Sequence, residues 1–142
     1  MEQLLNVVIL SSTAVPHFST LYEKMLTRKH VNCSGEYCDL ETYQPECWKN
    51  EVIVIDEAIY GRRHIGKCIS SSDVYSDFAD NPLYLGCSAN VLHLLDAKCS
   101  GRQQCQVRIP DAELEQTKPC LKDLKLFLEV RHHCVEGKVY SV

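Results

Sequence analysis

The sequence predicts an α+β fold, a small domain stapled by disulfides, and three observations lead to this class. Nine cysteines are spread from Cys33 to Cys134 instead of clustering in one motif, which is typical of a disulfide framework formed in an oxidising compartment. The segments with strand patterns are short, and one segment has the pattern of a main helix. With 142 residues, 45% of them hydrophobic, the chain is long enough for one domain with its own core.

Three regions are expected along the chain. Residues 1–32 contain no cysteine and carry apolar side chains at helical spacing between Phe18 and Leu26, which predicts an N-terminal appendage with an amphipathic helix. An export signal and a linker are both alternatives for this appendage, because its first apolar stretch is short and is interrupted by Asn6. Residues 33–137 form the expected domain, and residues 138–142 form a tail. No stretch of the sequence predicts a membrane span.

The first half of the domain is predicted to hold one strand and one long loop. Residues 52–55 (VIVI) are a β-branched apolar run, which is typical of a strand buried on both faces. A corner follows at residues 60–63 (YGRR). Residues 69–86 are rich in Ser, Asp, Asn and Pro, which indicates a long polar loop.

The main helix is expected in the second half of the domain. Apolar residues between Val91 and Leu95 are spaced as on one face of a helix, and either Ser88 or Asn90 can cap it. Residues 105–110 (CQVRIP) then predict a strand that ends at its proline.

The end of the domain carries a short acidic turn and the clearest strand. Residues 111–118 (DAELEQTK) predict one helical turn. In residues 124–134 the apolar side chains alternate with Lys125, Glu129 and Arg131, as in a strand with one buried face. Phe127 interrupts the alternation, so the second face is expected to be partly covered.

Several classes of function are excluded by composition and spacing. The net charge of −4 does not suit a nucleic-acid binder, which needs a concentrated basic surface. The cysteines include no CxxC pair, so neither a zinc ribbon nor a thioredoxin-type site is expected. His132 and His133 are neighbours on a predicted strand and point to opposite faces, so they cannot hold one ion together. No catalytic motif is present, and we expect no enzyme, no cofactor and no metal.

The corner at residues 60–63 has two interpretations. In the structural one, Gly61 supplies a turn, Arg62 pairs with a carboxylate, and Tyr60 packs partly buried. In the functional one, the same residues line a polar pocket with an aromatic floor. Such a pocket suits sugars, because a sugar ring has an apolar face and its hydroxyls bind carboxylates and cations.

The order of cysteines and motifs from Cys38 to Cys134 resembles the galactose- and rhamnose-binding lectin domain first known from sea urchin and fish eggs. The same module occurs in latrophilin adhesion receptors and in EVA-1 type guidance receptors. The resemblance rests on eight cysteines in order, on YGR at residues 60–62, on the CSGRQQC loop and on the closing LFLEVRHHC. It implies a compact domain of short antiparallel strands, one main helix and long loops.

The resemblance also implies the disulfide pairing and the residues of a sugar site. The implied bridges are Cys38–Cys68, Cys47–Cys134, Cys87–Cys120 and Cys99–Cys105, which leaves Cys33 unpaired. The implied contacts to a sugar are Asp39, Tyr60, Gly61, Arg62, Lys118, Lys122 and Lys125.

The sugar site departs from the family pattern at several of these positions. Asp39 keeps the acid with a shorter side chain, and Tyr60 is retained. Lys118 stands where the family has an Asp, which reverses a charge, and Ile59 replaces the Asn of the corner. Weak or absent binding of rhamnose and galactose is therefore expected, because a polar pocket loses affinity when its hydrogen-bonding groups are changed.

The leading interpretation is a non-enzymatic recognition module that is secreted or lies on the extracellular side of a membrane protein. Its partner is then a cell-surface or secreted protein, contacted as part of an adhesion or guidance receptor or of a secreted relative. The alternative is a working lectin for galactosides or rhamnosides. Neither interpretation involves nucleic acid.

Overall fold

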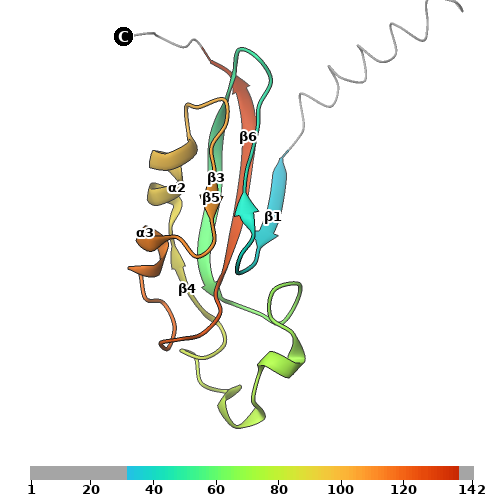
Figure 1. Ribbon diagram of the computed structural model, residues 1–142, viewed down its shortest axis with the longest axis vertical. Coiled ribbons are helices and arrows are strands. Elements are labelled where there is room, and N and C mark those ends of the chain that lie inside the picture. The colour runs from blue at the N-terminus through green and yellow to red at the C-terminus, as the bar shows by residue number, and fades with distance from the viewer. Residues whose placement is uncertain (1–31, 138–142) are drawn as a thin grey trace, which may run out of the picture. The chain divides into compact units, whose positions relative to one another are not determined.

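A four-stranded antiparallel sheet forms the centre of the domain (Figure 1). The computed structural model describes residues 32–137, so the expected appendage, except for Asn32, and the expected tail lie outside the described residues. The strand order is β1 (Cys33–Tyr37), β6 (Phe127–Glu136), β3 (Glu51–Arg62) and β4 (Cys87–Asn90). Each neighbouring pair is antiparallel, as the family resemblance implies.

Strand β3 is longer than expected, and one of its two faces is buried. Ile53 and Ile55 are buried, whereas Val52 and Val54 are half-buried, so the expectation of a strand covered on both faces was wrong. The register shifts after Ile55, at a β-bulge. A bulge inserts one extra residue, and beyond it Ala58 and Tyr60 point into the core instead.

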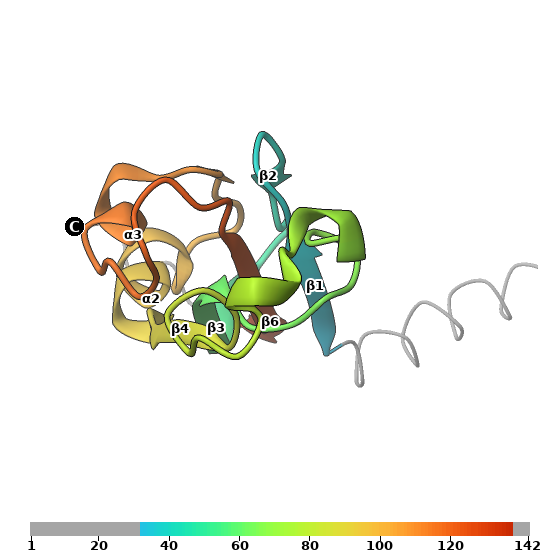
Figure 2. The same cartoon turned by 90° about the horizontal axis from the view of Figure 1, so that it is seen from below.

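Two short helices and a two-stranded ribbon cover the inner face of the sheet. Helix α2 (Leu92–Cys99) packs on β3, and α3 (Ala112–Glu115) follows the ribbon of β2 (Thr42–Tyr43) and β5 (Val107–Arg108). Figure 2, which looks along the strands, shows α2, α3 and β2 on the same side of the sheet. This arrangement leaves the opposite face of the sheet more open.

The caps of the two helices follow from nearby polar side chains. Val91 occupies the N-cap of α2, so neither Ser88 nor Asn90 takes the expected position. Asn90 still contributes, since its side-chain oxygen accepts a hydrogen bond from the Leu92 amide at 3.0 Å. The acidic turn is confirmed as α3, and the Asp111 carboxylate accepts hydrogen bonds from two of its amides.

Strand β6 shows the expected alternation. Leu128, Val130 and His132 are buried while Arg131 is exposed. Phe127 is 1% exposed, which confirms that the second face is covered at this point. The strand starts at Phe127, so the leucines ahead of it belong to the connecting segment instead.

Four disulfides hold these elements together. They join Cys38 to Cys68, Cys47 to Cys134, Cys87 to Cys120 and Cys99 to Cys105, which are the pairs that the family resemblance implies. Cys33 is free and exposed. The expected polar loop is present between β3 and β4 and contains two single turns of 3-10 helix, η1 (Ser71–Asp73) and η2 (Ser76–Phe78). It forms the lower end of the domain in Figure 1.

Candidate functional site

A hollow of about 370 Å³ lies beside the end of β3 and collects three of the residues that the resemblance singled out. Asp39, Tyr60 and Lys125 line it. Glu115 and Asp123 add two carboxylates, and the remaining wall is apolar: Ile109, Pro110, Leu124 and Leu126. We refer to it as the Tyr60 pocket. Its mix of carboxylates, one ammonium group and aliphatic surface suits a small ligand that carries hydroxyl groups.

The Tyr60 side chain contributes to the lining of this pocket. It comes from the inner face of β3 and is 1% exposed. Its hydroxyl donates a hydrogen bond to Glu115 Oε1. Burial, followed by this hydrogen bond and by the charges of Glu115 and Asp39, raises the pKa of Tyr60 far above its ordinary value of 10.0. The phenol therefore stays protonated and holds the Glu115 carboxylate at the pocket wall.

Glu115 and Asp123 are functional candidates that the comparison of sequence motifs missed. Glu115 is the last residue of α3, and the Asp111 cap fixes the start of that helix. Asp123 adopts a positive φ of 64° in the segment that follows Cys120. The acidic composition of residues 111–118 was the available signal for Glu115. Its contact with Tyr60 spans 55 positions in the chain, which no local pattern indicates.

A second hollow, of about 570 Å³, adjoins the first and contains the other two lysines. Lys118 and Lys122 line it, together with the Cys120 region. It shares Glu115, Asp123, Leu124 and Leu126 with the Tyr60 pocket. The charge reversal at Lys118 therefore affects the neighbouring hollow, while carboxylates still line the Tyr60 pocket.

Gly61 does not line the pocket, and it supplies no turn. It lies inside β3, directly opposite Ser88 of β4. A Cβ atom at this position would lie 2.3 Å from the Cys87 carbonyl oxygen and 2.6 Å from the Ser88 Cα. The glycine is needed because the two strands approach each other closely here.

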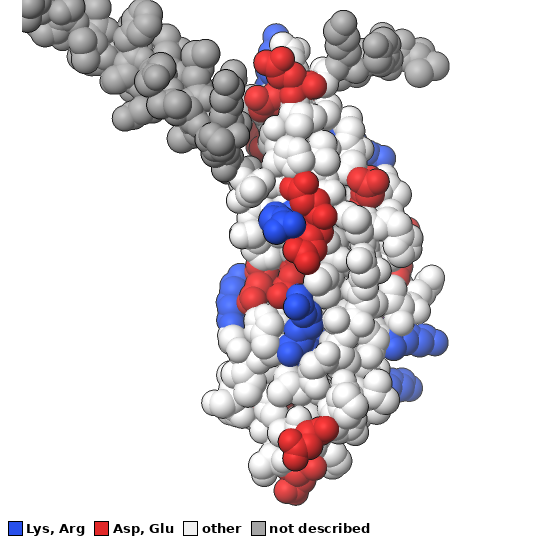
Figure 3. Space-filling model, turned by 180° about the vertical axis from the view of Figure 1, so that it is seen from behind, with Lys and Arg blue, Asp and Glu red and all other residues white. Residues whose placement is uncertain are grey.

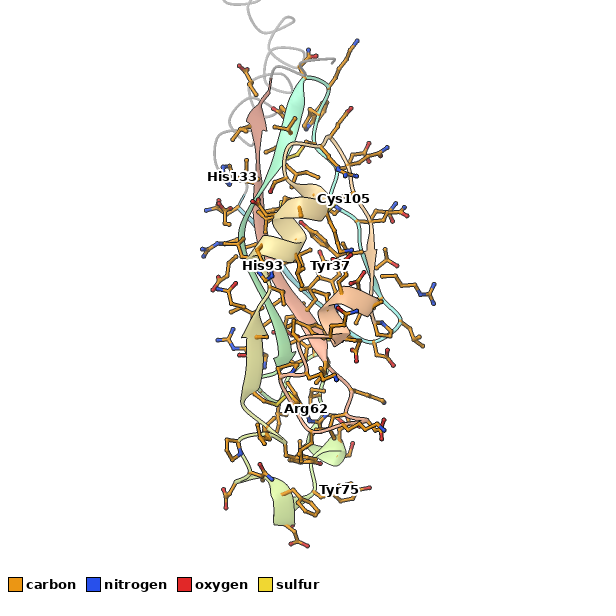
Figure 4. The ribbon with its side chains drawn as sticks, turned by 90° about the vertical axis from the view of Figure 1, so that its left-hand side faces the viewer. Tyr37, Arg62, Tyr75, His93, Cys105 and His133 are labelled. Atoms are coloured by element: carbon orange, nitrogen blue, oxygen red, sulfur yellow. A yellow bond between two sulfur atoms is a disulfide. The ribbon has the colours of Figure 1, made fainter. Side chains whose placement is uncertain are left out.

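Arg62 is also a structural residue in this fold, so the expectation that it contacts a sugar was wrong. Its side chain is buried at 2% exposure and lies above the loop that carries Tyr75 (Figure 4). Its guanidinium donates to the carbonyl oxygens of Asp73 at 2.7 Å and Lys125 at 3.2 Å, and it stacks on the Tyr84 ring. These acceptors are carbonyl groups, so the expected pairing with a carboxylate was wrong too.

His132 and His133, near the end of β6, point to opposite faces of the sheet, as expected for neighbours on a strand. His132 is buried, and its Nδ1 lies 2.9 Å from the Tyr43 hydroxyl. His133 points to the other face, where its Nδ1 lies 2.8 Å from Asp56 Oδ2. Burial lowers the pKa of His132 below its ordinary value of 6.5.

Comparison with known proteins identifies the family of this domain. A family model described as "D-galactoside/L-rhamnose binding SUEL lectin domain" matches residues 45–134, which span β3, the core of the sheet and three of the four disulfides. The chain belongs to this family. Membership of the SUEL lectin family thus accounts for the antiparallel strands, the main helix and the three disulfides within the matched residues.

Curated relatives of this SUEL lectin domain are much longer proteins. Latrophilin-like protein 1 of Caenorhabditis elegans is 27% identical over 124 residues, which cover 87% of this chain and 11% of the relative. Protein eva-1 homolog C is 28% identical in Mus musculus and 27% in Homo sapiens, in each case over 105 residues that cover 73% of this chain and 22% of the relative. The chain therefore spans about a tenth to a fifth of the length of these relatives. Within residues 32–137, no helix has the length and hydropathy required to cross a bilayer.

Proposed function

We propose that this SUEL lectin domain is a non-enzymatic extracellular module that binds a terminal galactoside or rhamnoside in the Tyr60 pocket. The observation that carries the proposal is the lining of that pocket, which places Asp39, Glu115, Asp123 and Lys125 around one hollow. The four disulfides support the extracellular location, since such bridges persist in oxidising compartments.

The chemistry of the pocket matches a monosaccharide unit. Carboxylates accept hydrogen bonds from vicinal hydroxyls, and such bonds to a charged group are among the stronger ones in proteins. The ammonium group of Lys125 can donate to a hydroxyl or ring oxygen. Ile109 and Leu126 belong to the apolar wall, which can contact the C–H face of the sugar ring.

The structure adds support to the lectin alternative over the protein-contact interpretation that the sequence favoured. That interpretation depended on several departures from the family pattern, among them the replacement of a family Asp by Lys118. Glu115, three positions earlier, brings a carboxylate to the pocket through its hydrogen bond with Tyr60, while Lys118 lines the neighbouring hollow. A pocket with this lining retains the acceptors that a sugar needs.

The test is a titration of the oxidised domain with galactose and rhamnose, followed by NMR and calorimetry. We expect shifts at residues that line the Tyr60 pocket. Glu115→Gln and Asp39→Asn should each weaken binding about tenfold or more, the effect of losing a hydrogen bond to a charged group. Glu113→Gln is the matched control, because Glu113 lies on the same helix but pairs with Lys98. No response to any galactoside or rhamnoside would overturn the proposal.

A second candidate function, contact with a protein, is favoured by a different surface. The large apolar side chains exposed on or beside the loop between β3 and β4 include Tyr75, Phe78, Leu83 and Leu121. Leu121 joins the group because its amide donates to the Leu83 carbonyl at 2.8 Å. Exposed apolar groups gathered in this way are typical of protein interaction surfaces. With Asp77 and Asp80 nearby, the surface suits an apolar partner with basic side chains at its rim.

The resemblance to adhesion and guidance receptors fits this second candidate. A tetramer of the domain applied to cells distinguishes the two. Binding that survives glycosidase treatment but is lost in Tyr75→Ser/Phe78→Ser indicates a protein partner. Binding that is lost on glycosidase treatment and in Glu115→Gln indicates a glycan.

A further inference from the structure

Two acidic side chains face each other across neighbouring strands on the open face of the sheet. Glu36 of β1 and Glu129 of β6 are directly paired in the register. Glu129 lies between Leu128 and Val130, which point into the core, so its side chain lies on the other face. Like charges at directly opposite positions of an antiparallel pair destabilise it. A cation between them would remove this repulsion.

A histidine from a third segment meets both carboxylates. His64 follows the end of β3, and its Nε2 lies 3.2 Å from Glu36 Oε1 and 3.3 Å from Glu129 Oε1. One ligand atom from each of the three residues lies within 4.8 Å of the others. The cluster thus combines one imidazole nitrogen and two carboxylates from three separate parts of the chain.

These separations are those between neighbouring ligands of a tetrahedral zinc ion. Zinc binds imidazole nitrogen and carboxylate oxygen at about 2.0–2.1 Å, which places adjacent ligand atoms about 3.3 Å apart in a tetrahedron. Charge-assisted N–H···O hydrogen bonds are shorter, at about 2.7–2.9 Å. A single Nε2 proton also cannot be directed at two glutamates equally well, whereas a metal ion can contact all three groups.

The surroundings orient the three ligands. His64 Nδ1 lies 3.4 Å from the Ile65 carbonyl oxygen, and a hydrogen bond on this side leaves the Nε2 lone pair for a metal. The His64 ring packs edge-on against the buried Phe127 ring, with 5.3 Å between centroids. Arg63 binds Oε2 of Glu129 at 3.1 Å, so Oε1 is left to face the histidine.

The charges of the cluster favour a divalent cation even with Arg63 beside it. Two ionised glutamates, one guanidinium and a neutral imidazole sum to −1. Figure 3, seen from behind relative to Figure 1, shows acidic and basic side chains close together along the middle of this face. The side chains of Glu36 and Glu129 are 28% and 23% exposed, so an ion can enter from solvent and keep a water ligand.

We propose that Glu36, His64 and Glu129 bind one zinc ion, with a fourth position open to water or to an oxygen of a partner. The imidazole ligand selects zinc over calcium and magnesium, which prefer sites made of oxygen ligands only. The ion would tie the edge strand β1 and the segment after β3 to β6. This site lies on the opposite face of the sheet from the Tyr60 pocket, so it is independent of the sugar proposal.

The test is calorimetry and thermal unfolding of the oxidised domain with ZnCl₂, CaCl₂ and MgCl₂ in turn. We expect saturable binding of one zinc ion. We also expect zinc to raise the Tm, and calcium and magnesium to leave it unchanged. Loss of a group that merely orients a ligand weakens metal binding about 10–100-fold, so His64→Gln and Glu36→Gln should raise the zinc Kd at least about tenfold. His93→Gln is the control, since His93 is an exposed histidine on α2.

Two results would overturn the proposal. One is the absence of any zinc response from a wild-type domain whose NMR spectrum shows that it is folded. The other is equal weakening in His64→Gln and His93→Gln, which would indicate adventitious binding to surface histidines. The NMR spectrum of each variant shows whether it has kept its fold.

Discussion

The Cys47–Cys134 bridge should contribute about twice as much stability as the Cys99–Cys105 bridge. The two bridges close chain segments with separations of 87 and 6 residues. If a disulfide acts by restricting the unfolded chain, its contribution grows with the logarithm of the loop length. That relation gives about 4.6 kcal/mol for the long loop and about 2.2 kcal/mol for the short one at 25 °C.

The measurement compares two double variants, Cys47→Ser/Cys134→Ser and Cys99→Ser/Cys105→Ser, in urea unfolding followed by circular dichroism. Cys47, Cys99 and Cys105 are buried, at 3%, 0% and 9% exposure, and Cys134 is partly buried against the same core. We expect the first variant to be about 2.4 kcal/mol less stable than the second. If that variant fails to fold while the second folds, the order is still as expected. Equal losses, or a larger loss in the second variant, would refute the entropic reasoning.

Three further predictions concern single residues. Gly61→Ala should lower the free energy of unfolding in urea by about 1–3 kcal/mol or more, because the new Cβ meets the backbone of β4. Gly35→Ala should lower it by less, because its Cβ meets only the end of the Tyr37 side chain. A larger loss for Gly35→Ala than for Gly61→Ala would contradict this reasoning. Arg62→Met should lower the free energy of unfolding by about 1.5–3 kcal/mol, because the carbonyl oxygens of Asp73 and Lys125 lose their charged donor, and it should leave sugar binding unchanged. Arg63→Met, whose guanidinium is at the surface, should lower it by at most about 1 kcal/mol. Finally, burial lowers the pKa of His132 below 6.5, so the unfolded chain takes up a proton more readily and stability should fall as the pH drops below about 6.5. Between pH 7.5 and 5.5 the free energy of unfolding should fall less in His132→Gln than in the wild-type domain. The same fall in both proteins would show that His132 is not the cause of the pH dependence.

The sequence was sufficient for elements whose apolar residues follow a clear period. Strand β6 and helix α2 carry such periods, and Leu95, Leu128 and Val130 are buried as predicted. Cys99 and His132 are buried too, although the periods did not indicate it. Strand β1 was not predicted, because CSGEY has no apolar alternation and its place depends on pairing with β6. The extent of β3 was missed as well, since the bulge after Ile55 changes which residues point inward.

The candidate sites were less accessible from the sequence than the fold. Tyr60 and Arg62 are near neighbours in the chain, yet Tyr60 lines a pocket while Arg62 donates to the carbonyl oxygens of Asp73 and Lys125. That difference arises from packing of the segments around them. The partners Glu115 and Glu36 come from distant parts of the chain, and only the tertiary structure brings them to Tyr60 and His64.

The strand order also bears on how this domain folds while it is being synthesised. The first strand, β1, pairs with the last, β6, which also pairs with β3. The sheet therefore cannot close until residues near 136 have left the ribosome, and contacts of such long range form slowly. Until then Cys47 has no native partner, whereas Cys38 and Cys68 already do. We therefore expect oxidative folding of a nascent chain to begin with the Cys38–Cys68 bridge and to finish with Cys47–Cys134.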